Sequence, residues 1–229
     1  MLKQIIIISD GQSNTGPNPV NMAALAFDNS IIVNTIGIID NEENSLPIFE
    51  LESIAENGGG ICELSNINNL SEALSRLTVK SVYNTVEEMV SQELKEILDL
   101  NIEEIEPRER HKFIKLIDKI GSEIDLRCLI LLDISGSMTN KIDMARKSIF
   151  ELLLFLEERI GKNHIGVIAF PYKNTNCKLL CDFTQDIDIL KQKIKILETG
   201  GTTPTGYAIE EAIKIFTEEQ EYPIYDNII

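Results

Sequence analysis

Three short apolar runs constrain the fold of this chain most, at residues 5–8, 31–39 and 128–132. Runs this short and nearly continuous are typical of central parallel strands with both faces covered. Segments with helical apolar spacing alternate with them, which predicts an α/β sheet. With 229 residues, 43% of them hydrophobic, the chain can bury a full core of this kind.

The same patterns predict the individual elements. Strands are expected at residues 4–9, 31–39, 60–64, 127–133, 164–170 and 177–183. Helices are expected between them, at residues 19–27, 46–56, 141–160, 186–197 and 207–218.

Short oxygen-bearing side chains follow two of these strands and precede one helix. Asp133, Ser135 and Ser137 end one strand, Asp10 ends another, and Thr203 lies in a Gly-rich loop before a helix. Such loops meet where an α/β sheet builds its ligand crevice. Oxygen ligands without Cys or His favour a hard divalent cation such as Mg²⁺. Serines after a strand also often cap the next helix, which is the alternative for the motif alone.

Together these residues make a D-x-S-x-S…T…D set that resembles the von Willebrand factor type A (VWA) domain. That family holds Mg²⁺, or Mn²⁺, at a metal-ion-dependent adhesion site. The resemblance implies that Ser135, Ser137 and Thr203 supply hydroxyls and that Asp133 and Asp10 act largely through bound waters. It also implies an open coordination position for an Asp or Glu of a partner protein.

The order of the parts is rotated relative to the family. Residues 1–80 resemble the second half of a VWA domain and residues 127–229 the first half. One circularly permuted domain, or two incomplete domains finished by other chains, would explain this order. Permutation is favoured because each half alone exposes unpaired strands. The expected fold is a Rossmann-like, doubly wound, mostly parallel six-stranded sheet. Its expected strand order is 177–183, 164–170, 127–133, 4–9, 31–39 and 60–64, with residues 177–183 antiparallel at one edge.

Residues 81–126 form a connector that the family does not predict. Helical apolar spacing continues from Leu70 to Leu98, which predicts one long helix. Pro107 suits the first turn of a second helix through Ile120, so a helical hairpin is expected. The connector either bridges the old termini only, or couples the metal site to the position of the hairpin.

The net charge indicates the class of partner, and the cysteines indicate the cellular compartment. There are 37 acidic against 21 basic residues, a net charge of −16, which disfavours direct nucleic-acid binding. No signal peptide or membrane span is evident, and the four cysteines do not require disulfides. A cytoplasmic protein is expected, as a monomer or a domain-swapped dimer.

Other candidate sites carry weaker signals. His111 and His164 lack metal-ligand spacing to a second histidine. Cys177 and Cys181 are expected to share one strand face, and a metal site there is a minor alternative. Glycines 58–60 and 200–201 suit turns better than phosphate loops. Residues 13–15 line the metal rim or serve ordinary loop roles.

The sequence suggests two classes of function. The first is a non-enzymatic, metal-dependent protein-interaction module that is regulatory or scaffolding. The alternative is a Mg²⁺-dependent phosphohydrolase, disfavoured because Ser135 replaces the second Asp of such sites and no lysine is visibly paired with the site. Residues 5–19, the order of the halves and the helical insert are similar to the YabS-like VWA proteins of spore-forming Gram-positive bacteria. This similarity implies an association with sporulation.

Overall fold

The computed structural model describes residues 1–39, 45–99, 105–173, 175–195 and 197–218. Strands and helices alternate along most of this chain, as predicted. The strands are β1 (Leu2–Ser9), β2 (Ile32–Ile38), β3 (Gly59–Ser65), β4 (Leu126–Asp133), β5 (Asn163–Phe170) and β6 (Lys178–Thr184). The helices are α1 (Pro19–Asp28), α2 (Ser45–Asn57), α3 (Leu70–Leu98), α4 (Pro107–Glu123), α5 (Ile142–Leu156), α6 (Ile187–Lys193) and α7 (Thr205–Glu218).

Within the described residues, these six strands form one sheet in the order β3-β2-β1-β4-β5-β6. β1 pairs in parallel with both β2 and β4, and only the edge strand β6 runs antiparallel to its neighbour. The predicted strand order and the predicted antiparallel edge are therefore confirmed. The first and last parts of the chain meet where β1 lies beside β4.

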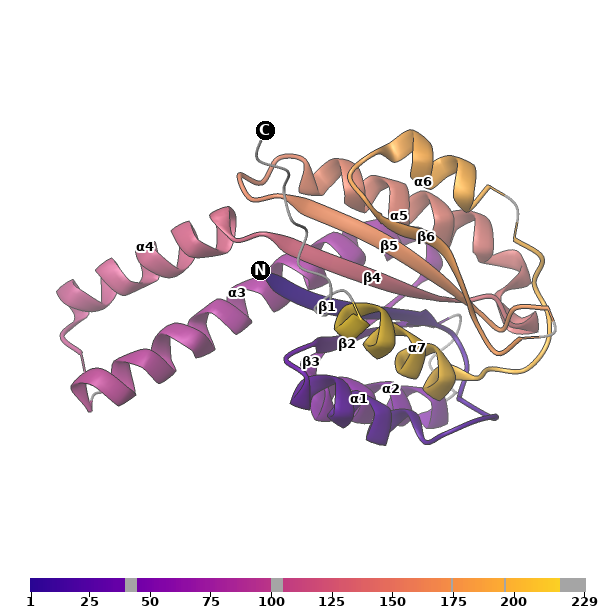
Figure 1. Ribbon diagram of the computed structural model, residues 1–229, viewed down its shortest axis with the longest axis horizontal. Helices are drawn as coiled ribbons and strands as arrows, with labels where there is room; N and C mark the ends of the chain where they lie inside the picture. The colour runs from indigo at the N-terminus through magenta and orange to yellow at the C-terminus, as the bar shows by residue number, and fades with distance from the viewer. Residues whose placement is uncertain (40–44, 100–104, 174, 196, 219–229) are drawn as a thin grey trace.

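Helices cover both faces of the sheet (Figure 1). The side chains of β1 alternate between two buried clusters: Ile6 and Ile8 face α3, α5 and α6, whereas Ile5 and Ile7 face α1, α2 and α7. All four isoleucines are fully buried. Burial on both faces explains why the central strands are almost continuously apolar. The predicted doubly wound α/β fold is confirmed.

Two helices end earlier than their patterns predicted. α5 ends at Leu156 and not at residue 160, because the chain turns so that the Arg159 guanidinium can donate to the carbonyls of Gly121 and Ile124. α6 ends at Lys193 and not at residue 197; residue 196 of that prediction lies outside the described residues. The backbone N–H of Ile194 closes this helix on Leu190. Apolar spacing continued past both ends and could not reveal them.

Both helices of the predicted hairpin are present, and the turn expected between them lies outside the described residues. α3 runs without a break over 29 residues, so the expected boundary at residue 80 falls inside one helix. α3 first packs against α5, then extends with α4 beyond the end of the sheet (Figure 1). The projecting part carries an apolar groove of about 390 Å³, whose lining includes Met89, Ile97 and Leu116. Among the described helices, none has the length and apolar character needed to cross a membrane.

Cys177 and Cys181 do not share a face of the sheet, contrary to the sequence prediction. Cys177 packs with the cluster beneath α7, whereas Cys181 lies in the cluster on the opposite face. The register of β6 against β5 shifts between the pairs Val167–Cys181 and Ile168–Leu179. Such a bulge reverses the alternation of side chains, which the sequence pattern does not reveal.

Substitutions in β1 and β4 test whether the two parts of the chain unfold together. Ile6 and Ile130 face each other in the strand register and are fully buried. Changing either to Ala should lower the free energy of unfolding by about 2 to 5 kcal/mol, because each change leaves a cavity. Urea unfolding followed by circular dichroism should show one transition that both variants move to lower urea.

The matched control is Ile160→Ala, because Ile160 is 76% exposed. This variant should change stability by less than about 0.5 kcal/mol. Two separate transitions, each sensitive to one of the buried substitutions, would contradict a single cooperative sheet.

Candidate metal centre

The candidate metal centre lies at the carboxyl ends of β1 and β4. Ile8 is in register with Leu132, so Ser9 and Asp133 follow side by side on neighbouring strands. The chain then leaves β1 at Asp10 and leaves β4 through Ile134, Ser135 and the short 3₁₀ helix η3 (Gly136–Asn140). Parallel pairing therefore brings together residues more than 120 positions apart in the sequence.

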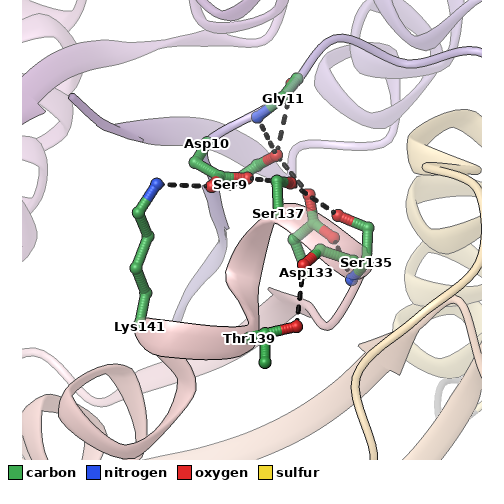
Figure 2. Close-up of polar contacts among 9 residues, drawn as sticks. Ser9, Asp10, Gly11, Asp133, Ser135, Ser137, Thr139 and Lys141 are labelled. Carbon is green, nitrogen blue, oxygen red and sulfur yellow. Dashed lines mark hydrogen bonds and ion pairs between the residues drawn. The ribbon is translucent and has the colours of Figure 1, made fainter. Parts of the chain in front are cut away.

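Asp133 is fully buried and held from two directions. Its Oδ2 accepts a hydrogen bond of 2.5 Å from Ser9 Oγ, and its Oδ1 accepts one of 2.8 Å from the backbone N–H of Ser135 (Figure 2). Burial raises the pKa of the Asp133 carboxyl to about 6, the two serine donors oppose that rise, and the charge of Asp10 adds to it. A buried carboxylate with this raised pKa gains from a nearby cation.

Asp10 and the two motif serines form a chain of short contacts (Figure 2). Ser137 Oγ donates to Asp10 Oδ1 at 2.6 Å, and the hydroxyls of Ser135 and Ser137 lie 3.2 Å apart. Ser135 is buried, whereas Ser137 is exposed. The site therefore combines the buried carboxylate of Asp133 with the solvent-exposed residue Ser137.

Thr203 reaches the same point from the loop before α7. A methyl group built on Gly11 would lie 3.9 Å from both Ser137 Oγ and Thr203 Oγ1, so both hydroxyls border the space over this glycine. Thr203 is held by Asn14, whose backbone N–H donates to the Thr203 carbonyl at 3.1 Å and whose Oδ1 accepts the Thr203 N–H at 2.9 Å. All five predicted residues are thus brought together.

The Gly-rich loop that carries Thr203 needs its glycines. Gly200 and Gly201 have φ angles of 150° and 85°, which side chains other than hydrogen disfavour. The Gly200 N–H donates to the carbonyl of Ile134 at 2.8 Å, which fastens this loop to the loop after β4. These glycines serve the turn, as predicted.

Ser13 and Asn14 hold the loop that carries Thr203 and are not among the five candidate metal ligands. Ser13 Oγ donates to the Thr203 carbonyl at 3.1 Å, beside the Asn14 contacts. The Ser13 N–H donates to Glu50 Oε1 at 2.6 Å, although Glu50 comes from α2. Burial raises the pKa of the Glu50 carboxyl, and its hydrogen bonds to Ser13 and Gln12 oppose the rise. The loop after β1 is therefore tied both to the Thr203 loop and to α2.

Lys141 was missed, and the expectation that no lysine pairs with the site is wrong. Its Nζ lies 2.6 Å from Asp10 Oδ2, and their side chains are only 11% and 2% exposed (Figure 2). Lys141 stands 131 positions from Asp10, so only the folded sheet brings the two together. Ser9 and Glu50 were missed for the same reason.

The weaker candidates do not join this site. Across the described part of the chain, no group of three or more His, Cys, Asp or Glu side chains could hold a metal. Cys177 and Cys181 lie on opposite faces of the sheet, which removes a paired thiolate site. Burial and the charge of Arg127 lower the pKa of His164, which lies in β5. Of the candidate metal sites, only the cluster of serine, threonine and aspartate side chains at the ends of β1 and β4 is left.

These residues fit a hard divalent cation. Three hydroxyls and two carboxylates, all oxygen donors, converge from three loops. A buried carboxylate with a raised pKa and the space over the Gly11 Cα both suit a small cation there. Mg²⁺ and Mn²⁺ take such ligands and retain waters in their remaining positions.

Comparison with known proteins identifies the class. Residues 128–227 match the von Willebrand factor type A domain family. The uncharacterized protein YabS of Bacillus subtilis (strain 168) is 37% identical over 214 residues, 92% of this chain and 87% of YabS. The chain therefore belongs to the VWA domain family and is a relative of YabS.

Two further proteins are similar. The crystal structure of an uncharacterized protein from Alicyclobacillus acidocaldarius superposes with a TM-score of 0.88 and 31% identity, covering 96% of this chain and 95% of that one. The uncharacterized protein MJ0910 of Methanocaldococcus jannaschii is 31% identical over 84 residues, 37% of this chain and 45% of MJ0910. The Alicyclobacillus protein therefore shares the fold along nearly its whole length.

The raised pKa of Asp133 predicts how the metal-free protein responds to pH. The folded-state pKa is about 6 against an ordinary value of 3.8, so the folded protein holds this proton more tightly than the unfolded chain. Stability from this group is complete below pH 3.8 and is lost as the pH rises towards and past 6. In metal-free buffer, wild type should lose about 2 kcal/mol between pH 4 and pH 7 relative to Asp133→Asn.

Urea unfolding of both proteins at each pH measures this difference, in which the other carboxyl groups cancel. Asp143→Asn is the control, because Asp143 is 87% exposed; its difference from wild type should change little with pH. A wild-type protein that gained stability over Asp133→Asn as the pH rose would contradict the assignment.

Proposed function

We propose that this protein is a non-enzymatic, metal-dependent interaction module with a metal-ion-dependent adhesion site. The observation that carries the proposal is the convergence of five oxygen-bearing side chains from three loops around Gly11. These side chains are Asp10, Asp133, Ser135, Ser137 and Thr203. VWA domains commonly bind protein ligands through such a metal.

Each residue has a distinct task in this proposal. Ser135, Ser137 and Thr203 offer hydroxyl oxygens to Mg²⁺ or Mn²⁺. Asp133 is already engaged by Ser9 and Ser135, and Asp10 by Ser137 and Lys141, so both carboxylates suit roles through bound waters. The bound metal supplies positive charge to a partner's Asp or Glu, which an uncharged side chain would not match.

The same proposal treats the chain as one circularly permuted VWA domain. Residues 1–80 and 127–229 would be its second and first halves, joined through the connector at residues 81–126. The parallel pairing of β1 with β4 supports this interpretation, because one half alone lacks the other's central strand. A monomer satisfies all sheet pairings, and a domain-swapped dimer would preserve them.

A Mg²⁺-dependent phosphohydrolase is the alternative. Lys141 beside Asp10 removes one argument against it, since such enzymes use a lysine near their carboxylates. Ser135 still occupies the position where a second Asp would act as general acid. The interaction module is therefore favoured, and a phosphatase assay with Mg²⁺ separates the two: hydrolysis lost in Asp133→Ala would favour the enzyme.

The cellular setting belongs to the proposal as well. The free cysteines suit a reducing compartment, so we place the protein in the cytoplasm. The net charge of −16 favours a protein partner over nucleic acid. The similarity to YabS supports a regulatory or scaffolding role associated with sporulation.

Metal-dependent stabilisation tests the proposed site. A ligand that binds only the folded state adds RT ln(1 + [L]/Kd), about 2.7 kcal/mol at a hundredfold excess over Kd. Thermal unfolding of wild type should therefore move to higher temperature with Mg²⁺ or Mn²⁺ and return with EDTA. Asp133→Ala should abolish this shift, because it removes the buried carboxylate.

The exposed Asp143 provides the matched control. Asp143→Ala removes one carboxylate from the same region and should keep the full metal response. The proposed site is wrong if Asp133→Ala and wild type respond equally, or if wild type gives no response at millimolar metal.

A further inference from the structure

The hairpin formed by α3 and α4 has an apolar face that the described part of the chain leaves open. The two helices project beyond the sheet and line the groove of about 390 Å³, which we call the hairpin groove (Figure 1). Among the described residues, its lining is apolar apart from Glu93. Ile97 is 73% exposed and Leu116 is 44% exposed, although both line this groove. An open apolar face of this kind is typical of a protein–protein interface.

Each of the two helices has an apolar stripe that is wider than the other helix can cover. Val86 of α3 and Ile117 of α4 are almost fully buried. Met89 follows Val86 by three residues, yet it is exposed. Leu116 is likewise exposed beside Ile117. Helices with such stripes complete their burial in a four-helix bundle, where each helix contacts two neighbours. The groove therefore fits a second pair of helices.

Charges of opposite sign border the hairpin groove on its two helices. On α3, Glu93 lines the groove and Glu96 follows three residues later, on the same side of the helix. On α4, Lys112 and Lys119 lie four residues before and three residues after Leu116, on the side of that residue. All four charged residues are exposed. A partner with the same two kinds of helix can match both sets of charges.

The same difference in charge extends over the two helices. Residues 86–98 carry four Glu and one Lys, whereas residues 107–123 carry five Lys or Arg and three Asp or Glu. Lys112 also contacts Glu109 at 2.8 Å within α4, but both side chains are exposed and a pair of this kind contributes little. The Lys112 ammonium has three donors, so it can contact a second carboxylate as well. An acidic α3 beside a basic α4 thus makes the hairpin complementary to a second copy of itself.

We infer that the hairpin groove is a homodimer interface, in which the hairpins of two copies of this chain form a four-helix bundle. A two-fold axis parallel to the helices sets α3 of each chain on α4 of the other. An axis across the helices would instead set like helices on each other. The charges favour the first arrangement, because unlike helices then meet at both contacts. Each chain keeps its own complete sheet, so this dimer requires neither a domain swap nor the proposed metal site.

Analytical ultracentrifugation of the whole chain measures the dissociation constant of the dimer. Wild type should form dimers at micromolar concentration. Leu116→Glu and Ile97→Glu each put a carboxylate into the apolar groove and should raise the dissociation constant at least about tenfold. Ile114→Glu is the matched control and should keep the wild-type constant. Ile114 also lies on α4 and is 41% exposed, but it is outside the groove lining.

Charge reversal tests which helices meet. The variant Glu93→Lys/Glu96→Lys makes the groove side of α3 basic, and the variant Lys112→Glu/Lys119→Glu makes that of α4 acidic. Each variant alone should lose the dimer, because like charges then face each other at both contacts. An equimolar mixture, with one variant fluorescently labelled, should restore dimers that contain both chains. If like helices met instead, each variant alone would dimerise as wild type does, which would overturn the pairing of α3 with α4.

Three further results would contradict the inference. A wild type that stays monomeric up to about 0.1 mM would leave the groove to another occupant, such as a different protein. A dimer that neither groove variant weakens would be held elsewhere, as in a domain-swapped sheet. A mixture of the charge variants that stays monomeric would exclude the bundle of unlike helices. Far-UV circular dichroism checks the helix content, and if one groove variant loses it, the other groove variant and the charge variants still give the comparison.

Discussion

The parallel pairing of β1 with β4 is the interaction on which the rest of the structure depends. It joins the first and last parts of the chain into one sheet. It also sets Ser9 beside Asp133, so that Asp10 follows next to the D-x-S-x-S turn. Without this pairing, the carboxylates and hydroxyls of the site would belong to separate surfaces.

This arrangement is unfavourable in one respect, because it brings the carboxylates of Asp10 and Asp133 together in the protein interior. Two carboxylates lie close together, and burial raises the pKa of one of them. The chain offsets this with hydroxyl and backbone donors on Asp133 and with the Lys141 ammonium on Asp10. Such partial compensation keeps the metal-free site folded while it retains an attraction for a cation.

At the opposite end of the molecule, the helices α3 and α4 project beyond the sheet. α3 begins after η1 (Ile67–Asn69), at the carboxyl end of β3, and its far end projects with α4 beyond the sheet (Figure 1). One continuous helix therefore reaches from the metal-site side of the sheet to an exposed apolar groove. Coupling of the connector to the site, one of its two interpretations, requires a continuous helix of this kind.

Much of this structure was predictable from sequence because its signals are local. Continuous apolar runs gave the central strands, and Asp10, Asp133, Ser135, Ser137 and Thr203 lie next to strand or helix ends that the patterns located. The remainder depends on contacts across the sheet. The Lys141 partner is 131 positions away, and the bulge in β6 that separates Cys177 from Cys181 is a matter of register. The end of α5, after which Arg159 donates to the carbonyl of Gly121, likewise could not be predicted from the apolar spacing.

Anomalous diffraction from crystals grown with Mn²⁺ is the most direct test of the central claim. The account predicts an anomalous peak over Gly11, between the hydroxyls of Ser137 and Thr203. The carboxylates of Asp133 and Asp10 should lie around it, with Lys141 still on the far oxygen of Asp10. A peak elsewhere, or no peak here in crystals that contain Mn²⁺ at millimolar concentration, would contradict the account.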